Sequence, residues 1–253
     1  LSQLDLDLYE RQVSSSEKVS LSLSDTQQAF NNLLESELKK NSLWSQDEGI
    51  LQQRKTEATC ILVHTLSTQI VDPCPQWVDS LGISPEFRLG ELIPSDVIAE
   101  MEFQFSFNQE AELFAQGQRH EMGGWIKGFM DLVFRRQIGP QEYRYYVLDW
   151  KSNALETYTR SEIHHSMLDS HYDIQAKLYQ LALHEWLMDS LGSEYNPSRH
   201  LGGAIYAYVR GNRQSPNQDS FVSYPPLLEE MEQSRELFKK MLQQYSHSMK
   251  GDQ

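Results

Sequence analysis

Two stretches of this chain combine a strand-like apolar pattern with a single aspartate. Residues 125–136 read W-I-K-G-F-M-D-L-V-F-R-R, residues 143–150 read Y-R-Y-Y-V-L-D-W, and the Gly-Pro pair at 139–140 is typical of a turn. The pattern predicts a hairpin whose strands carry Asp131 and Asp149 among core residues. Because a buried aspartate is rare unless it is paired or binds a metal, these two positions constrain both the fold and its chemistry.

Lys151 adds a cationic group to this pattern. Residues i and i+2 of a strand point to the same side, so Asp149 and Lys151 project toward one spot, which Asp131 reaches from the neighbouring strand. Two carboxylates suit Mg²⁺, which takes oxygen ligands, and the backbone carbonyl of Trp150 could supply another oxygen. A bound cation would polarise a phosphoryl oxygen and lower the pKa of a bound water. Lys151 would position that water or stabilise developing negative charge, so the residues indicate phosphodiester hydrolysis.

A structural interpretation of the same residues stays open. A D-x-K triplet arises by chance about once in a chain of this size, so the triplet alone carries no weight. The aspartates could instead form buried ion pairs with Lys151 or Lys127. Their position inside two apolar strands favours the metal site, because solvated charges would not lie in a row of core residues.

A predicted helix further along the chain carries two more candidate site residues. Residues 172–188 show helical spacing of apolar side chains, and Gln175 and Tyr179 lie four apart on one helical face. Their amide, ring and hydroxyl groups could hold a DNA strand near the metal. The alternative is a half-buried polar stripe on a surface helix.

The remaining pattern predicts one domain built from strands and helices. We expect a flexible, Ser-rich segment over 1–23 and a single domain over 24–250, with a helical part at 24–99 and a catalytic core at 100–211. The expected helices are 24–40, 47–68, 172–188 and 226–247, with Pro73 and Pro75 ending the second, and further strands are 101–107 and 204–209. Strands flanked by helices indicate an α/β or α+β domain.

Three motifs occur in an order that resembles a known family. They are G-F-M-D, L-D-W-K-S-N and Q-A-K-L-Y, and they match the patterns G-x-x-D, D-Y-K-[ST] and Q-x-x-x-Y. These patterns are typical of the RecB-type nucleases, the C-terminal nuclease domains of exodeoxyribonuclease V beta subunits in the PD-(D/E)xK superfamily. The resemblance is strong over residues 100–211 and weak over 1–99.

The resemblance implies a fold, a chemistry and partners. It implies an α/β, restriction-endonuclease-like fold with a central mixed sheet flanked by helices. It implies DNA cleavage with Mg²⁺, or Mn²⁺ as a substitute, held by Asp131 and Asp149, with catalysis by Lys151 and support from Gln175 and Tyr179. The implied partners are single-stranded DNA and duplex ends, the gamma and alpha subunits of an exodeoxyribonuclease V complex, and the RecA recombinase. The implied role is the processing of double-strand DNA ends for recombination.

The chain departs from the family pattern at two places. Trp150 stands where the family has tyrosine, which keeps an aromatic ring and the backbone carbonyl. The family also has a histidine metal ligand in a G-x-x-x-H-x-x-[LF] context before the first strand, and this context is absent here. His64 lacks that glycine and lies in a different predicted helix, and His120, His164, His165 and His171 occupy other positions. Either the sequence begins after that helix or the ligand is lost. Glu102 matches a glutamate of the family's first strand and could assist the site or serve the structure.

The bulk composition adds further expectations. The 253 residues carry a net charge of −14, whereas DNA-binding domains are usually basic, which suggests that a larger assembly supplies the DNA-gripping surface. The charge and the missing histidine also keep a second hypothesis open, a catalytically silent docking module, and another endonuclease of the same fold is a third. Two cysteines outside any C-x-x-C pair predict a reducing cytoplasm. The sequence contains no run of about 18 apolar residues, so we expect no membrane span.

Overall fold

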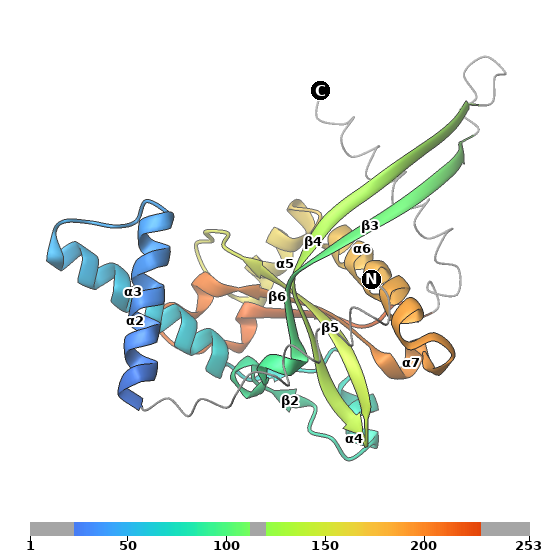
Figure 1. Ribbon diagram of the computed structural model, residues 1–253, viewed down its shortest axis with the longest axis horizontal. Coiled ribbons are helices and arrows are strands. Elements are labelled where there is room, and N and C mark those ends of the chain that lie inside the picture. The colour runs from blue at the N-terminus through green and yellow to red at the C-terminus, as the bar shows by residue number, and fades with distance from the viewer. Residues whose placement is uncertain (1–22, 112–119, 229–253) are drawn as a thin grey trace.

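The structure is a computed structural model that describes residues 23–111 and 120–228 of the chain (Figure 1). Its N-terminal part contains α2 (Leu23–Lys40), α3 (Glu48–Ser67), β1 (Ile70–Val71), α4 (Pro75–Ser80), β2 (Glu86–Phe87), and the short 3-10 helices η1 (Leu89–Glu91) and η2 (Pro94–Asp96). The larger strands are β3 (Val97–Ala111), β4 (His120–Gly139), β5 (Glu142–Lys151), β6 (Leu201–Tyr208) and β7 (Phe221–Tyr224). Between β5 and β7 lie α5 (Arg160–Asp169), α6 (Tyr172–Leu191), η3 (Gly192–Glu194), α7 (Pro197–His200), η4 (Val209–Asn212) and η5 (Gln218–Ser220).

A five-stranded mixed sheet forms the centre of the fold. Its strand order is β3-β4-β5-β6-β7, in which β5 and β6 are parallel and the other neighbours are antiparallel. A parallel pair needs a long crossover, and α5 and α6 supply it between β5 and β6. The predicted hairpin is the β4–β5 pair, and the predicted α/β fold with a central mixed sheet flanked by helices is confirmed.

Helices α5 and α6 cover one face of the sheet, and residues 70–92 cover the other (Figure 1). Residues of α6 pack on β3, β4 and β5 in a buried cluster that includes Met130, Val147 and Leu183, while α5 and α6 pack on β6. On the opposite side, Ile70, Phe87 and Leu89 pack against inward side chains of β4, β5 and β6. Successive side chains of β5 and β6 thus enter clusters on opposite faces in alternation, as expected for a sheet that is buried on both faces.

Strands β3 and β4 extend beyond the rest of the sheet as a two-stranded arm (Figure 1). Strand β4 pairs with β5 only from Leu132 onward, so the residues before it are paired in the sheet with β3 alone. Within the arm, Ala99 pairs with Leu132 and Met101 with Met130, and between them Glu100 has φ of 52°, in the left-handed region. This unusual backbone lies across from Asp131, the position at which β4 separates from β5.

Helices α2 and α3 match their predicted ranges within one residue at each end. Asp47 caps α3 by accepting a hydrogen bond from the Ile50 backbone N–H at 3.1 Å, and Lys55 pairs with Glu35 of α2 at 2.6 Å. The prediction that prolines end the second helix is wrong. Helix α3 ends earlier, at the Thr68 cap, and Pro75 instead lies at the start of α4, where its missing N–H costs nothing.

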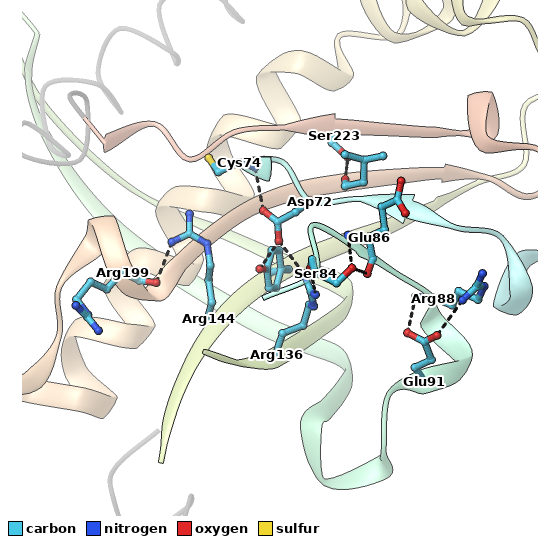
Figure 2. A network of polar contacts seen from close by, with 12 residues as sticks. Asp72, Cys74, Ser84, Glu86, Arg88, Glu91, Arg136, Arg144, Arg199 and Ser223 are labelled. Carbon is cyan, nitrogen blue, oxygen red and sulfur yellow. Dashed lines mark hydrogen bonds and ion pairs between the residues drawn. The ribbon is translucent and has the colours of Figure 1, made fainter. Parts of the chain in front are cut away.

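A buried carboxylate joins the N-terminal segment to the sheet. Asp72 follows β1 and accepts hydrogen bonds from Arg136 Nη1 at 2.9 Å and from the Tyr146 hydroxyl at 2.6 Å. Its other oxygen accepts the backbone N–H of Cys74 at 2.9 Å (Figure 2). Since Asp72 is only 2% exposed, these partners offset the cost of burying its charge. The network fixes the 70–92 segment against the face of the sheet that is opposite α6.

Other elements were not expected from the sequence. Helix α5 lies in a stretch that reads as a polar connection, because only Ile163 and Met167 give it a buried apolar stripe, and β7 has only four residues. The predicted helix at 226–247 lies almost wholly outside the described residues, as does the predicted flexible segment 1–23. Within the described ranges, no helix is long and apolar enough to cross a membrane.

Candidate active site

The two predicted metal ligands lie where β4 and β5 diverge. Leu132 pairs with Leu148, the closest pair to this end of the two strands, so Asp131 and Asp149 come directly beyond it. Asp149 is buried, at 4% exposure, and Asp131 is half-buried. Asp131 Oδ2 accepts the backbone N–H of Trp150 at 2.8 Å, which bridges the gap between the strands. At this point the Asp131 carboxylate takes the place of a backbone acceptor between the two strands.

Lys151 lies beside Asp149, as the strand spacing predicts. Its Nζ atom is 2.6 Å from Asp149 Oδ2 and 2.9 Å from Gln175 Oε1. The lysine is only 7% exposed, which is unusual for an ammonium group and is compensated by these two oxygens. The side chain therefore links the end of β5 to α6.

Helix α6 adds Gln175 and Tyr179 to the same group of side chains. Gln175 Nε2 donates to the Tyr179 hydroxyl at 2.8 Å, across one helical turn. Tyr179 is 7% exposed, so these residues do not form a polar stripe on a surface helix. The structure brings Asp149, Lys151, Gln175 and Tyr179 into one hydrogen-bonded chain, with Asp131 next to it.

Burial dominates the electrostatics of this group. It raises the pKa of Asp149 above its ordinary value, although the hydrogen bond and charge of Lys151 act to lower it and the charge of Asp131 acts to raise it. Burial also raises the pKa of Tyr179, and the nearby carboxylates of Asp149 and Asp131 add to this effect. The tyrosine thus stays protonated and can donate its hydroxyl hydrogen to a negative group.

Gly128, the first residue of the G-x-x-D motif, makes room for an aromatic side chain. A Cβ atom at this position would lie 2.6 Å from Phe103 Cζ. The Phe103 ring lies across the glycine and contacts the Tyr179 ring edge-on, with centroids 5.8 Å apart. Gly128, three residues before Asp131, therefore leaves room for Phe103 of β3 to pack against Tyr179.

Two tyrosines not predicted as site residues also contact Lys151. The Nζ atom lies 3.6 Å from the ring centroid of Tyr172 and 5.1 Å from that of Tyr206. Tyr172 is the first residue of α6 and Tyr206 lies in β6. Tyr172 precedes Gln175 by three positions in Y-D-I-Q, which is the one sequence signal that could have indicated it.

Other candidate residues have structural partners. Lys127 pairs with Glu102 at 2.8 Å across the β3–β4 arm, so the alternative in which Lys127 neutralises a site aspartate is wrong. His64 lies in α3 and its Nδ1 atom is 3.0 Å from the Asn212 carbonyl oxygen. Among residues 23–111 and 120–228, no three His, Cys, Asp or Glu side chains group together as metal ligands.

Comparison with known proteins gives the family. A family model described as "PD-(D/E)XK nuclease superfamily" matches residues 10–251, nearly the whole chain. The chain belongs to the PD-(D/E)XK nuclease superfamily. This membership agrees with the mixed sheet and with the strand-borne Asp131, Asp149 and Lys151.

Proteins with a similar sequence include the RecBCD enzyme subunit RecB of several bacteria. The chain is 39% identical to that of Escherichia coli K12 over 110 residues, which is 42% of this chain and 9% of the relative. It is 28% identical to that of Haemophilus influenzae over 183 residues, which is 63% of this chain and 15% of the relative. The subunit from Mycobacterium tuberculosis H37Rv is 39% identical over 92 residues, 35% of this chain and 8% of the relative. The matched region is thus a small part of each of these proteins.

The donor set of this PD-(D/E)XK site fits a hard divalent cation. Superfamily members generally use such ions, and two carboxylates are oxygen ligands of the kind that Mg²⁺ takes while keeping several waters. Burial raises the pKa of Asp149, and repulsion by the charge of Asp131 raises it further. A cation between them would relieve this repulsion.

Proposed function

We propose that this chain is a metal-dependent DNA nuclease domain that hydrolyses phosphodiester bonds. The observation that carries the proposal is the convergence of Asp131, Asp149 and Lys151 at the point where β4 and β5 diverge. Three buried or half-buried ionisable groups where two neighbouring strands diverge are costly for stability alone, and such clusters mark functional sites. Membership of the nuclease superfamily supports the same conclusion.

In this proposal each residue has a distinct task. Asp131 and Asp149 would hold Mg²⁺ or Mn²⁺, with the Trp150 carbonyl as a further oxygen donor. The cation would supply Lewis-acid chemistry, which polarises a phosphoryl oxygen and lowers the pKa of water. Lys151 would position the attacking water or stabilise charge that develops on the phosphoryl group. Gln175 fixes Lys151, because its Oε1 atom accepts from Nζ at 2.9 Å, and Tyr179 fixes Gln175 in turn.

The biological setting is a further proposal. The relatives are named as the RecB subunit of the RecBCD enzyme, so we place this domain in a helicase-nuclease that processes double-strand DNA ends in the cytoplasm for recombinational repair. Its partners would be DNA, the gamma and alpha subunits, and RecA. Partner subunits would explain how a domain of net charge −14 meets DNA, since they would supply the cationic surface. Both exonuclease and endonuclease action belong to this proposal.

One observation favours a second candidate, a catalytically silent docking module. Asp149 is already neutralised by Lys151, and the described part of the chain offers no third acidic or histidine side chain grouped with the two aspartates. The nuclease is the stronger proposal, because a silent domain gains nothing from keeping Asp131 and Asp149 together.

Cleavage of single-stranded DNA separates the two candidates. The wild-type chain is incubated with end-labelled DNA and Mg²⁺ or Mn²⁺, with and without EDTA, beside Asp149→Asn. The nuclease proposal expects cleavage that EDTA abolishes and that falls by roughly 100-fold or more in Asp149→Asn. Asp96→Asn is the matched control, since Asp96 is also a partly buried carboxylate. It lies away from the site and pairs with Arg135, with Arg135 Nε and Asp96 Oδ1 2.9 Å apart. A wild type as inert as Asp149→Asn with both cations supports the docking module instead.

A further inference from the structure

Two tyrosine rings lie next to the ammonium group of Lys151, in addition to its two oxygen partners. Tyr172 is closer, with its ring centroid 3.6 Å from Nζ, and the Tyr206 centroid is 5.1 Å away. Both distances are within the range of a cation–π interaction, in which the negative face of the ring attracts the cation. The two rings are stacked, with centroids 6.0 Å apart and planes 19° from parallel.

Both rings are themselves held by site residues. The Tyr172 hydroxyl donates to Asn153 Oδ1 at 3.3 Å, and Asn153 is the last residue of the D-W-K-S-N run that contains the lysine. The Tyr206 hydroxyl donates at 3.3 Å to Gln175 Oε1, the atom that also accepts from Lys151. Tyr206 is completely buried, so its ring has little freedom to move.

The start of α6 fixes the position of Tyr172. The preceding residue, His171, has φ of 54° in the left-handed region, and it turns the chain sharply between α5 and α6. A non-glycine residue adopts this conformation only at a cost in free energy, so the surrounding packing must impose it. The turn places Tyr172 at the first position of α6, over the end of β5.

We propose that Tyr172 and Tyr206 form an aromatic cage that positions the Lys151 ammonium beside Asp149, which makes both tyrosines positioning residues of the active site. A lysine side chain has four rotatable carbon–carbon bonds, and two oxygen partners at 2.6 and 2.9 Å do not by themselves fix the direction of its third N–H. Two ring faces within cation–π distance add attractive contacts that restrict where the ammonium can lie. The ammonium is then held in one place before a substrate binds, which lowers the cost of reaching the transition state.

The effects of substitutions at Tyr172 distinguish a cation–π contact from packing alone. If Tyr172 only filled space, a leucine would serve almost as well as an aromatic ring. If its ring face holds the cation, Tyr172→Phe keeps the function and Tyr172→Leu loses it. The catalytic consequence rests on the proposed nuclease function, whereas the cage itself can be tested without any cleavage.

Nuclear magnetic resonance tests the cage directly. The full chain is labelled with ¹³C at the lysine side chains, and the Lys151 ε-CH₂ signal is assigned by its loss in Lys151→Arg. A group above an aromatic ring is shielded by the ring current, so we expect an upfield ε-CH₂ proton shift that persists in Tyr172→Phe and collapses in Tyr172→Leu. A Lys151 signal at the ordinary lysine position in the wild type overturns the cage, whether or not the chain cleaves DNA.

Steady-state cleavage tests the positioning role. We expect Tyr172→Leu to lower kcat by about 5- to 30-fold, the range of a lost cation–π contact, with KM changed less than about 3-fold. Tyr172→Phe and Tyr206→Phe, which keep their rings, should stay within about 3-fold of the wild type. Tyr143→Leu is the matched control, because it removes a tyrosine ring 4.0 Å from the Arg135 guanidinium at the other end of β5.

The outcomes separate this proposal from the proposed function. A shielded Lys151 signal with the expected kcat loss supports both. A wild type that does not cleave DNA overturns the nuclease function, and the Lys151 signal then decides the cage alone. A Tyr172→Leu variant that folds with the wild-type melting temperature and keeps the wild-type kcat overturns the positioning role.

Discussion

The Nζ atom of Lys151 lies 2.6 Å from Oδ2 of Asp149, and the side chains of both residues are more than nine-tenths buried. Each residue is thus the main compensation for burying the charge of the other. Burial already raises the pKa of Asp149, and Lys151 is the main group that opposes this rise. Stability and chemistry therefore depend on the same pair.

Removing Lys151 should destabilise the fold in a pH-dependent way. In Lys151→Met the carboxylate stays buried without its cation, so we expect the free energy of unfolding to fall by about 3 kcal/mol at pH 8 in EDTA. The folded-state pKa of Asp149 then rises further above the unfolded value of about 3.9, so the folded chain retains a proton and the loss shrinks toward pH 5. Urea unfolding at both pH values measures this, and the difference should vanish when Asp149→Asn is added. Equal losses at pH 5 and pH 8 in the single variant would contradict the pairing.

Replacing Glu100 by glycine should raise the stability of the fold. Its φ of 52° costs a non-glycine residue about 1–2 kcal/mol, part of which Glu100→Gly regains after the loss of unfolded-chain entropy is subtracted. We expect Glu100→Gly to raise the unfolding free energy by about 0.5 kcal/mol and the β-branched Glu100→Val to lower it. Glu102→Gly, two residues along the same strand, is the control and should lower stability, because glycine weakens a strand interior. A loss in Glu100→Gly as large as that in Glu102→Gly would argue against strain at this position.

A side chain at position 128 should destabilise the fold, because the Phe103 ring lies across Gly128. A Cβ atom would be 2.6 Å from Phe103 Cζ, so Gly128→Ala should lower the unfolding free energy by about 1–3 kcal/mol. It should also lower cleavage, because the displaced ring is in contact with Tyr179. The double variant Gly128→Ala with Phe103→Leu should recover part of the stability, since leucine lacks the clashing ring atom. Strict additivity of the two single changes would show that the ring and the glycine are not coupled.

Two buried histidines should make the fold sensitive to mild acid. Burial lowers the pKa of His184 and of His200, and His200 Nδ1 accepts the Asn196 backbone N–H at 2.9 Å, so its ring is neutral. With folded pKa values below the unfolded value of about 6.5, their contribution is complete above pH 6.5 and is lost as pH falls through the folded pKa. We expect the unfolding free energy to decrease from pH 7 to pH 5, and less steeply in His184→Gln. Identical slopes for wild type and variant would exclude His184 as a cause.

Strands and helices whose apolar residues follow a clear strand or helix period could be predicted from the sequence. The alternating apolar residues of 125–136 and 143–150 and the helical spacing of 172–188 correspond to β4, β5 and α6. The i, i+2 rule predicted that Asp149 and Lys151 share a side of their strand, and the structure places them 2.6 Å apart. These features depend on local geometry alone, which is why a single sequence contains them.

Contacts that depend on tertiary register were not predictable. Tyr206 reaches Gln175 only because the α5–α6 crossover sets β6 parallel to β5 with Asp149 opposite Tyr206. Helix α5 has too few apolar residues for its periodicity to be recognised, and Asp72 meets Arg136 from 64 residues away in the chain. The catalytic and metal-binding roles of the site residues remain predictions that need measurement.

The dependence of the DNA cleavage rate on Mg²⁺ concentration tests the central claim most directly, namely that Asp131 and Asp149 hold a catalytic cation. We predict a saturating curve for the wild type, a half-saturating concentration raised roughly tenfold or more in Asp131→Asn, and no measurable cleavage in Asp149→Asn, with Asp96→Asn following the wild type. Cleavage that proceeds without a divalent cation, or curves that coincide for the wild type and both site variants, would contradict the claim.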